Sequence, residues 1–179
     1  CQYTDWGWWA QEITIDYGDE YVETYQVPIG TYVVGELADP SQMPKYGSAT
    51  YEGHVLANIV NNGAHYIAAG TLGLTYNFGH RTGSMSINEL DGINYLGTVG
   101  GAGGGFNPDN RYSGTLTGTG YDSGYSAEID GAFFRRPDPQ NRWDHVVETG
   151  GQVIITGPGD YNGAGTFQGS MQGDIGVGN

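Results

Sequence analysis

Basic residues are scarce in this sequence. Its 179 residues include 20 Asp and Glu but only 6 Lys and Arg, which gives a net charge of −14, and Lys45 is the only lysine. Because contacts to nucleic-acid phosphates need lysine and arginine, this balance excludes a nucleic-acid-binding protein, and it disfavours binding to anionic membrane surfaces. The charge fits a soluble protein in salty or cation-rich water, where salt screens the repulsion between like charges.

Long apolar runs and cysteine pairs are also missing. No run is long enough to cross a bilayer as a helix, so we expect no transmembrane segment. The single cysteine, Cys1, has no second cysteine with which to bind a metal. Three interpretations of Cys1 stay open: the lipidated N-terminus of a lipoprotein, a partner in a disulfide with another chain, or an internal residue of a longer protein.

Convincing helical stretches are absent as well, whereas glycine and tyrosine are abundant. The chain has 33 Gly and 14 Tyr, and this glycine content is more than twice the usual share of ~7%. Together with regular turn signals, this composition predicts an all-β protein. The length suits one domain, or one domain with an appendage.

Apolar and polar residues alternate from residue 48 onward, which is typical of half-buried strands. The first such strand, "SATYEGHVLANIV", precedes the hairpin signal "NNG" (61–63) and a return strand over 64–78. Consecutive hairpins predict a small up-and-down antiparallel β-barrel of about eight strands, because closure removes exposed sheet edges. Further strands are expected over 84–87, 93–99, 111–119, 123–135, 151–157 and 163–171, with Tyr51, Tyr66, Leu74, Tyr76, Ile129 and Phe133 among the buried side chains.

The chain divides into three regions on this basis. Residues 1–46 form an extended aromatic and acidic N-terminal segment with a linker, residues 47–172 form the barrel, and residues 173–179 are a tail. An aromatic residue precedes a glycine by two positions in "YEG" (51–53), "YLG" (95–97), "YSG" (112–114), "YNG" (161–163) and "FQG" (167–169). We interpret this repeat as geometric, since glycine lets a strand bend sharply and leaves room for a nearby ring.

The N-terminal segment carries three tryptophans within four residues. Trp6 and Trp8 lie on one face of an expected strand and Trp9 on the other. Two interpretations are open: the rings cap their own barrel end, or they form an interface with another copy of the chain, because a monomer rarely leaves so large an apolar patch in water. Arg135 and Arg136 are further interface candidates, with local salt bridges as the alternative.

Catalytic signatures are not found, so we expect a protein that is not an enzyme. There is no nucleophile elbow, and "GGAGGG" (100–105) lacks the lysine and the following helix of a phosphate-binding loop. The four histidines, at 54, 65, 80 and 145, lack metal-ligand spacing. We expect His54 and His65, which flank one hairpin, to be solvent-facing cross-strand neighbours.

Calcium is the one cofactor that the sequence leaves open. Oxygen-rich segments occur at 16–20, 107–110 and 137–144, although none has the spacing of a known calcium loop. Asp16, Asp19 and Glu20 are the preferred candidate ligands. The alternative for all three segments is a solvated turn.

The motifs of residues 47–97 resemble the barrel domain of transferrin-binding-protein-like proteins, in the version appended to large secreted or surface proteins of alphaproteobacteria. The resemblance lies in a G-x-A-x-Y-x-G strand, the "NNG" hairpin, a Y-x-F-G-x-R-x-G corner and an L-D-G-x-x-Y-x-G hairpin. The segments "EIDGAFF" (128–134) and "GAGTFQG" (163–169) fit the closing strands, and "CQYTDWGWW" (1–9) resembles the lead-in of the appended version.

This resemblance implies an eight-stranded barrel on an extracellular or outer-surface protein, and it implies no catalytic residues. Relatives bind host iron proteins, haem proteins or complement regulators through variable loops, and no such loop motif occurs here. We expect a non-catalytic structural or interaction module that self-assembles with its own copies into a fibre or surface array. The alternative is an outer-surface lipoprotein receptor for a host or environmental protein or an iron-carrying ligand.

Overall fold

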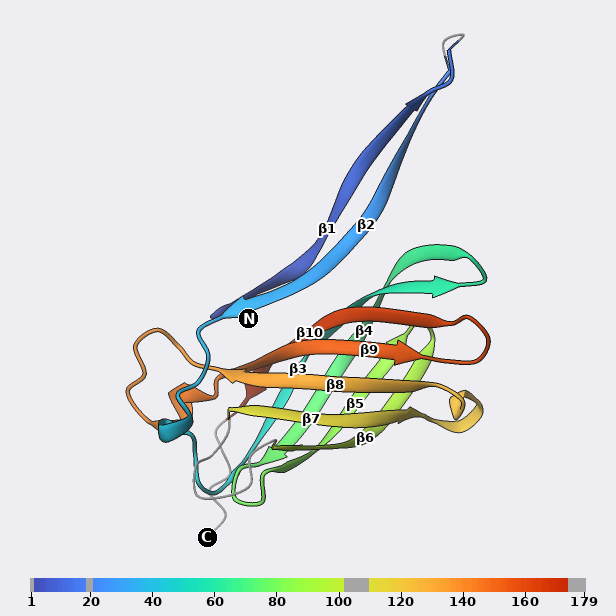
Figure 1. Ribbon diagram of the computed structural model, residues 1–179. Coiled ribbons are helices and arrows are strands. Elements are labelled where there is room, and N and C mark those ends of the chain that lie inside the picture. The colour runs from blue at the N-terminus through green and yellow to red at the C-terminus, as the bar shows by residue number, and fades with distance from the viewer. Residues whose placement is uncertain (1, 19–20, 102–109, 174–179) are drawn as a thin grey trace.

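The computed structural model describes residues 2–18, 21–101 and 110–173, apart from the side chains of residues 26, 28 and 29. Strands dominate these residues, and every strand pairing is antiparallel. The chain forms a two-stranded hairpin followed by a closed eight-stranded barrel (Figure 1). The expected all-β, up-and-down barrel is therefore confirmed.

The barrel strands follow one another in sequence order, and the last strand pairs with the first to close the sheet. Their bounds are β3 (Ser48–Asn61), β4 (Ala64–Asn77), β5 (Thr82–Leu90), β6 (Ile93–Gly101), β7 (Arg111–Gly118), β8 (Ser126–Phe134), β9 (Glu148–Thr156) and β10 (Asn162–Gln172). The "NNG" hairpin is confirmed, since Asn61 pairs with Ala64 across a turn in which Asn62 and Gly63 both have positive φ.

The core is rich in aromatic rings. Of the six side chains expected inside, five are buried and Tyr66 is half-buried against the core. Tyr76, Tyr112 and Phe133 meet at centroid distances of 5.0 to 5.8 Å, which favours packing beyond the area buried. The barrel interior is thus filled by side chains, as expected for eight strands.

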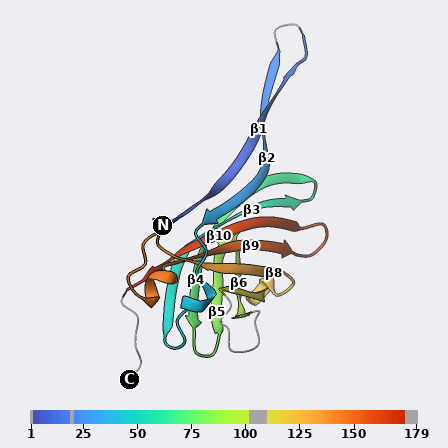
Figure 2. The same cartoon turned by 60° about the vertical axis from the view of Figure 1, so that its left-hand side comes forward.

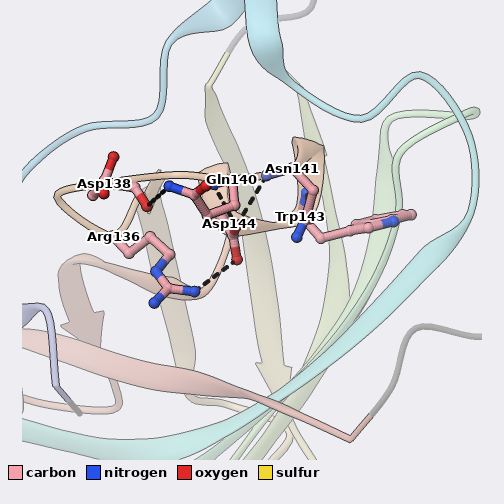
Figure 3. Close-up of polar contacts among 6 residues, drawn as sticks. All are labelled: Arg136, Asp138, Gln140, Asn141, Trp143 and Asp144. Carbon is pink, nitrogen blue, oxygen red and sulfur yellow. Dashed lines mark hydrogen bonds and ion pairs between the residues drawn. The ribbon is translucent and has the colours of Figure 1, made fainter.

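One end of the barrel is closed by the segment between β8 and β9. This segment contains the short 3₁₀ helix η3 (Arg142–His145), whose Trp143 ring packs edge-on against Phe78 at 5.9 Å. Asp144 is buried, and its carboxylate accepts hydrogen bonds from the backbone N–H groups of Gln140 (2.7 Å) and Asn141 (3.0 Å) and from Arg136 (3.2 Å) (Figure 3). This carboxylate therefore organises the segment, and calcium binding by residues 137–144 stays a prediction.

The N-terminal hairpin consists of β1 (Thr4–Asp16) and β2 (Val22–Gly35). It extends away from the barrel, and both views show its far end standing clear of the barrel strands (Figures 1 and 2). A linker with the short 3₁₀ helix η1 (Pro40–Gln42) leads from β2 to β3. In the part of the chain that the structure describes, no helix has the length and apolar character needed to span a membrane.

Candidate functional site

The projecting hairpin exposes an unusual amount of apolar surface. Trp9 is 61% exposed and Trp8 is 43% exposed. The other large apolar side chains that the hairpin exposes are Ile13, Ile15, Tyr17, Tyr21, Val22, Tyr25, Val27, Tyr32 and Val34. Contiguous apolar patches of this kind mark interaction surfaces in soluble proteins.

Two kinds of side-chain contact occur in the hairpin: rings that pack across its two strands, and hydrogen bonds between neighbouring residues of the segment 21–25. Aromatic rings fold over glycines of the opposite strand: a Cβ on Gly30 would lie 3.0 Å from Nε1 of Trp9, and one on Gly7 would lie 3.4 Å from the Tyr32 hydroxyl. Near the far end, the hydroxyls of Tyr21 and Tyr25 both donate to the carboxylate of Glu23. These donors lower the pKa of Glu23 from its usual value.

The base of the hairpin is fixed to the barrel by a buried carboxylate. Glu148, at the start of β9, accepts hydrogen bonds from the backbone N–H groups of Gln2 (2.5 Å) and Tyr3 (3.1 Å) and from the hydroxyl of Thr4 (2.6 Å). On the β2 side, Leu37 forms an isolated bridge with Phe134. A two-stranded hairpin is at best marginally stable alone in water, so this anchoring positions it relative to the barrel.

Two grooves flank the hairpin base on the outer wall of the barrel. The first, which we call the β2 groove, has a volume of about 550 Å³ and lies between β2 and strands β7 to β10. Its lining includes Thr31, Val33, Phe134, Gly150 and Thr166. Thr166 is buried, and its hydroxyl has no hydrogen-bond partner.

The second groove, which we call the β1 groove, has a volume of about 680 Å³ and lies between Trp6 of β1 and strands β10, β3, β4 and β5. The rings of Trp6 and His54 lie nearly parallel, at a centroid distance of 6.2 Å and an interplanar angle of 15°. Gln168 also lines this groove, is 2% exposed and has an Nε2 group with no hydrogen-bond partner.

The structure corrects one interpretation of the tryptophans. They do not cap the end of their own barrel: Trp8 and Trp9 are exposed on the hairpin, and Trp6 lies against the outer wall. The tryptophan that packs at the barrel end is instead Trp143 of η3, which lies against Phe78. Local alternation alone could not reveal this, because the direction of the hairpin depends on its distant anchor at Glu148.

Both arginines of the expected interface have partners within the chain. Arg135 forms an ion pair with Glu36, and Arg136 forms one with Asp144 at 3.2 Å. These pairs are the local alternative that the sequence left open. An interface role for Arg135 and Arg136 stays a prediction.

Of the preferred calcium ligands, Asp16 is the one that the structure describes, and it is the last residue of β1. Asp16 accepts a hydrogen bond from the backbone N–H of Gly18 at 2.9 Å, which is a local turn interaction; Asp19 and Glu20 lie outside the described residues. Among the residues that the structure does describe, no three acidic, histidine or cysteine side chains cluster as a metal site. Calcium binding stays a prediction, as do the three interpretations of Cys1, which also lies outside the described residues.

The expected pairing of His54 with His65 is wrong. In the β3–β4 register His54 faces Thr71 and His65 faces Val60, so the two imidazoles sit far apart along the hairpin. His54 instead belongs to the β1 groove. The contributions of Gln168 and Glu148 were missed, because both depend on long-range contacts with the N-terminal hairpin.

Comparison with solved structures identifies the architecture. A transferrin-binding protein B mutant from Haemophilus parasuis Hp5 superposes with a TM-score of 0.65 at 15% identity, over 97% of this chain and 33% of that chain. The haemoglobin receptor HpuA from Kingella denitrificans gives 0.59 at 17% identity, over 100% of this chain and 57% of that one. The barrel has the transferrin-binding-protein-like fold.

A surface lipoprotein also shares this TbpB-like fold, with a TM-score of 0.58 at 12% identity over 96% of this chain and 77% of that chain. The present chain thus spans about a third of the transferrin-binding protein and little more than half of HpuA. No protein-family model matches the sequence, and no curated protein is similar to it. At sequence identities this low, the structural similarity establishes the fold of the barrel and nothing further. The alphaproteobacterial context stays a prediction.

Proposed function

We propose that this chain is a non-catalytic module of the cell surface that binds a protein ligand, with the β1–β2 hairpin as its main contact. The observation that carries the proposal is the exposed apolar surface of that hairpin. Trp9, Tyr25 and Val27 are all exposed on a thin, anchored element that has no barrel wall behind its far end (Figure 2). A protein partner would cover these side chains and stabilise the hairpin.

The structural neighbours support a receptor more than a fibre subunit. They are a transferrin-binding protein, a haemoglobin receptor and a surface lipoprotein, and one structure contains HpuA with human haemoglobin. By analogy, this chain takes a protein ligand at the outer cell surface, and an iron-carrying protein is the first class to test. The analogy rests on fold, so it supplies candidates and not contact residues.

Self-assembly into a fibre or array, which was the leading expectation, has no support from these neighbours. It remains the second candidate because the two-stranded hairpin leaves both outer strand edges unpaired within the described sheet. An open edge can pair with a strand of another copy. A repeated contact of that kind would grow an open filament unless its rotation closes a ring.

The test compares hairpin and barrel positions of similar exposure. Haemoglobin and transferrin are passed over the immobilised chain, and their binding is measured for the original sequence, for Trp9→Ser and Val27→Ser, and for Leu96→Ser. Leu96 is 53% exposed on the barrel strand β6 and serves as the matched control. Sedimentation velocity of the same samples measures self-association.

The proposal predicts that at least one of these proteins binds, that both hairpin substitutions weaken binding by about tenfold or more, and that Leu96→Ser leaves it unchanged. Binding that survives both hairpin substitutions would contradict the proposed contact. Concentration-dependent polymers abolished by Trp9→Ser, with neither protein bound, would favour the self-assembling module instead.

A further inference from the structure

The β1 groove presents a regular grid of polar side chains on the outer wall of the barrel. The strand registers place Gln168, His54, Thr71 and Asn88 in one row across β10, β3, β4 and β5. The next row contains Ser170, Glu52, Gly73 and Ser86. Gly73 has no side chain to fill the middle of this row, and a Cβ there would lie 3.0 Å from the Ser86 hydroxyl oxygen.

An aromatic wall stands beside the grid. Trp6 is half-buried and belongs to the groove lining, and Glu148 fixes the hairpin base that carries it. The groove volume of about 680 Å³ falls within the range of ~300–1,000 Å³ that is usual for small-ligand sites. The combination is a flat ring next to hydroxyl, amide and carboxylate groups.

One polar group in the groove lacks a partner. Gln168 is 2% exposed, it lines the groove, and its Nε2 donates no hydrogen bond. A buried amide donor without an acceptor costs roughly 1–3 kcal/mol, and such groups call for an explanation in terms of a ligand or a role. An acceptor on a ligand that displaces the side chain slightly would relieve this cost.

The lining narrows the chemical class of the ligand. His54 is the only basic residue in the lining and Glu52 the only acidic one, so the groove matches neither a strongly anionic ligand nor a divalent cation. Strands β3 and β4 are paired on both sides within the barrel, so a peptide could not add to them as a strand. A ligand must therefore be recognised by side chains, through hydrogen bonds and through contact with the Trp6 ring.

We propose that the β1 groove binds a neutral glycan segment. A sugar ring has an apolar C–H face, which suits the Trp6 indole, and hydroxyls around its edge, which suit Asn88, Thr71 and Glu52. The Gln168 amide would donate to one of these hydroxyl oxygens. This site is separate from the exposed far part of the hairpin, so it does not depend on the protein ligand proposed above.

The test is an NMR titration of the tryptophan indole N–H signals in the intact chain. The probes are trisaccharides of glucose, galactose, mannose and N-acetylglucosamine, added to millimolar concentrations, with an unstructured Gly–Ser peptide as a further probe. Assignment uses Trp→Phe substitutions. We expect a saturable shift of the Trp6 signal with at least one sugar and no shift of Trp9, which lies outside the groove lining.

Two substitutions make the assignment specific. Trp6→Ala should weaken sugar binding by about tenfold or more, because stacked aromatic side chains dominate binding surfaces. Asn88 is exposed, so Asn88→Ala should fold normally and weaken binding several-fold, followed through the Trp6 signal, while Trp9→Ala should leave it unchanged. No saturable Trp6 shift with any sugar, a shift with the peptide alone, or unaltered sugar binding in Asn88→Ala would overturn the proposal.

Discussion

Inside the barrel, aromatic rings lie against glycines of the neighbouring strands. Tyr112 pairs with Gly131, and a Cβ on that glycine would lie 2.4 Å from the ring. Phe167 and Gly151 form a second such pair, at 2.9 Å. The ring therefore covers a glycine across the sheet, rather than the one two residues further along its own strand.

The glycines of the repeated aromatic-x-glycine motif serve a related purpose. A Cβ on Gly53 would lie 1.9 Å from the carbonyl oxygen of Gln168, and one on Gly114 would lie 2.3 Å from that of Thr98. No side chain fits at these distances, so these glycines let the strands approach closely. The repeat is geometric, as its spacing predicted.

Gly131→Ala should lower the free energy of unfolding by about 1–3 kcal/mol, the usual cost of overpacking a core. The new methyl group would collide with the Tyr112 ring, which is fully buried and cannot move away freely. Urea denaturation measures the change. Gly100→Ala is the control, because its nearest neighbour would be 3.8 Å away; a similar loss in both variants would contradict the account.

The stability of the fold should depend on pH through the carboxyl group of Asp144. Burial alone would raise the pKa of its carboxyl, but the hydrogen bonds from Gln140 N, Arg136 and Asn141 N outweigh burial and hold the pKa below the ordinary value of 3.8. Since the folded-state pKa is lowered, the carboxylate stabilises the fold fully above that ordinary value. Its contribution falls as the pH drops through the folded-state pKa.

Asp144→Asn should therefore destabilise the protein by about 1–3 kcal/mol at neutral pH, and the difference from the original chain should shrink below pH ~4. Thermal unfolding of both proteins between about pH 2 and pH 7 measures this difference in stability. Asp138→Asn, an exposed position in the same segment, is the control and should change little. A pH-independent loss in Asp144→Asn would show that charge is not the cause.

At the level of elements, the sequence predicted the barrel strands closely and the hairpin only in part. The strands β3 and β4 were visible because alternation and the "NNG" turn are local signals. Residues 1–46 were recognised as extended, but their pairing into a hairpin that leaves the barrel was not. That geometry depends on Glu148, which is distant in sequence and gives no local signal.

The two elements should respond differently to the loss of an aromatic ring. Phe167→Ala removes a fully buried ring from the barrel and should cost about 3–5 kcal/mol. Trp9→Ser removes an exposed ring from the hairpin and should change barrel stability by less than about 0.5 kcal/mol. Near-ultraviolet circular dichroism during thermal unfolding follows the barrel; a large loss in Trp9→Ser would mean that the hairpin belongs to the barrel core.

At the level of the whole molecule, the net charge of −14 bears on the calcium prediction. A cation that binds only the folded state stabilises it. If Asp16, Asp19 and Glu20 hold calcium, excess chelator should lower the melting temperature at constant sodium chloride, which keeps the screening of the overall charge fixed. An unchanged melting curve in excess chelator would contradict calcium binding by these residues.

The described residues combine a closed TbpB-like barrel with one protruding apolar element. Two features of the candidate sites, the stacking of Trp6 on His54 and the unpartnered Gln168 amide, arise only from the tertiary arrangement. The sequence left two interpretations of Trp6, Trp8 and Trp9 open, capping of the barrel end and an interface with another copy of the chain. The structure excludes capping, because Trp8 and Trp9 are exposed on the hairpin, and the interface stays a prediction.

Site-specific photo-crosslinking tests the central claim most directly, namely that the hairpin contacts a protein ligand. A photoreactive amino acid replaces Trp9 or, as the control, Leu96, which has comparable exposure on the barrel, and the chain is irradiated in the cells that produce it. The account predicts one discrete adduct with a different protein from position 9 and none from position 96. Adducts from position 96 alone, equal adducts from both, or adducts only between copies of this chain would contradict it.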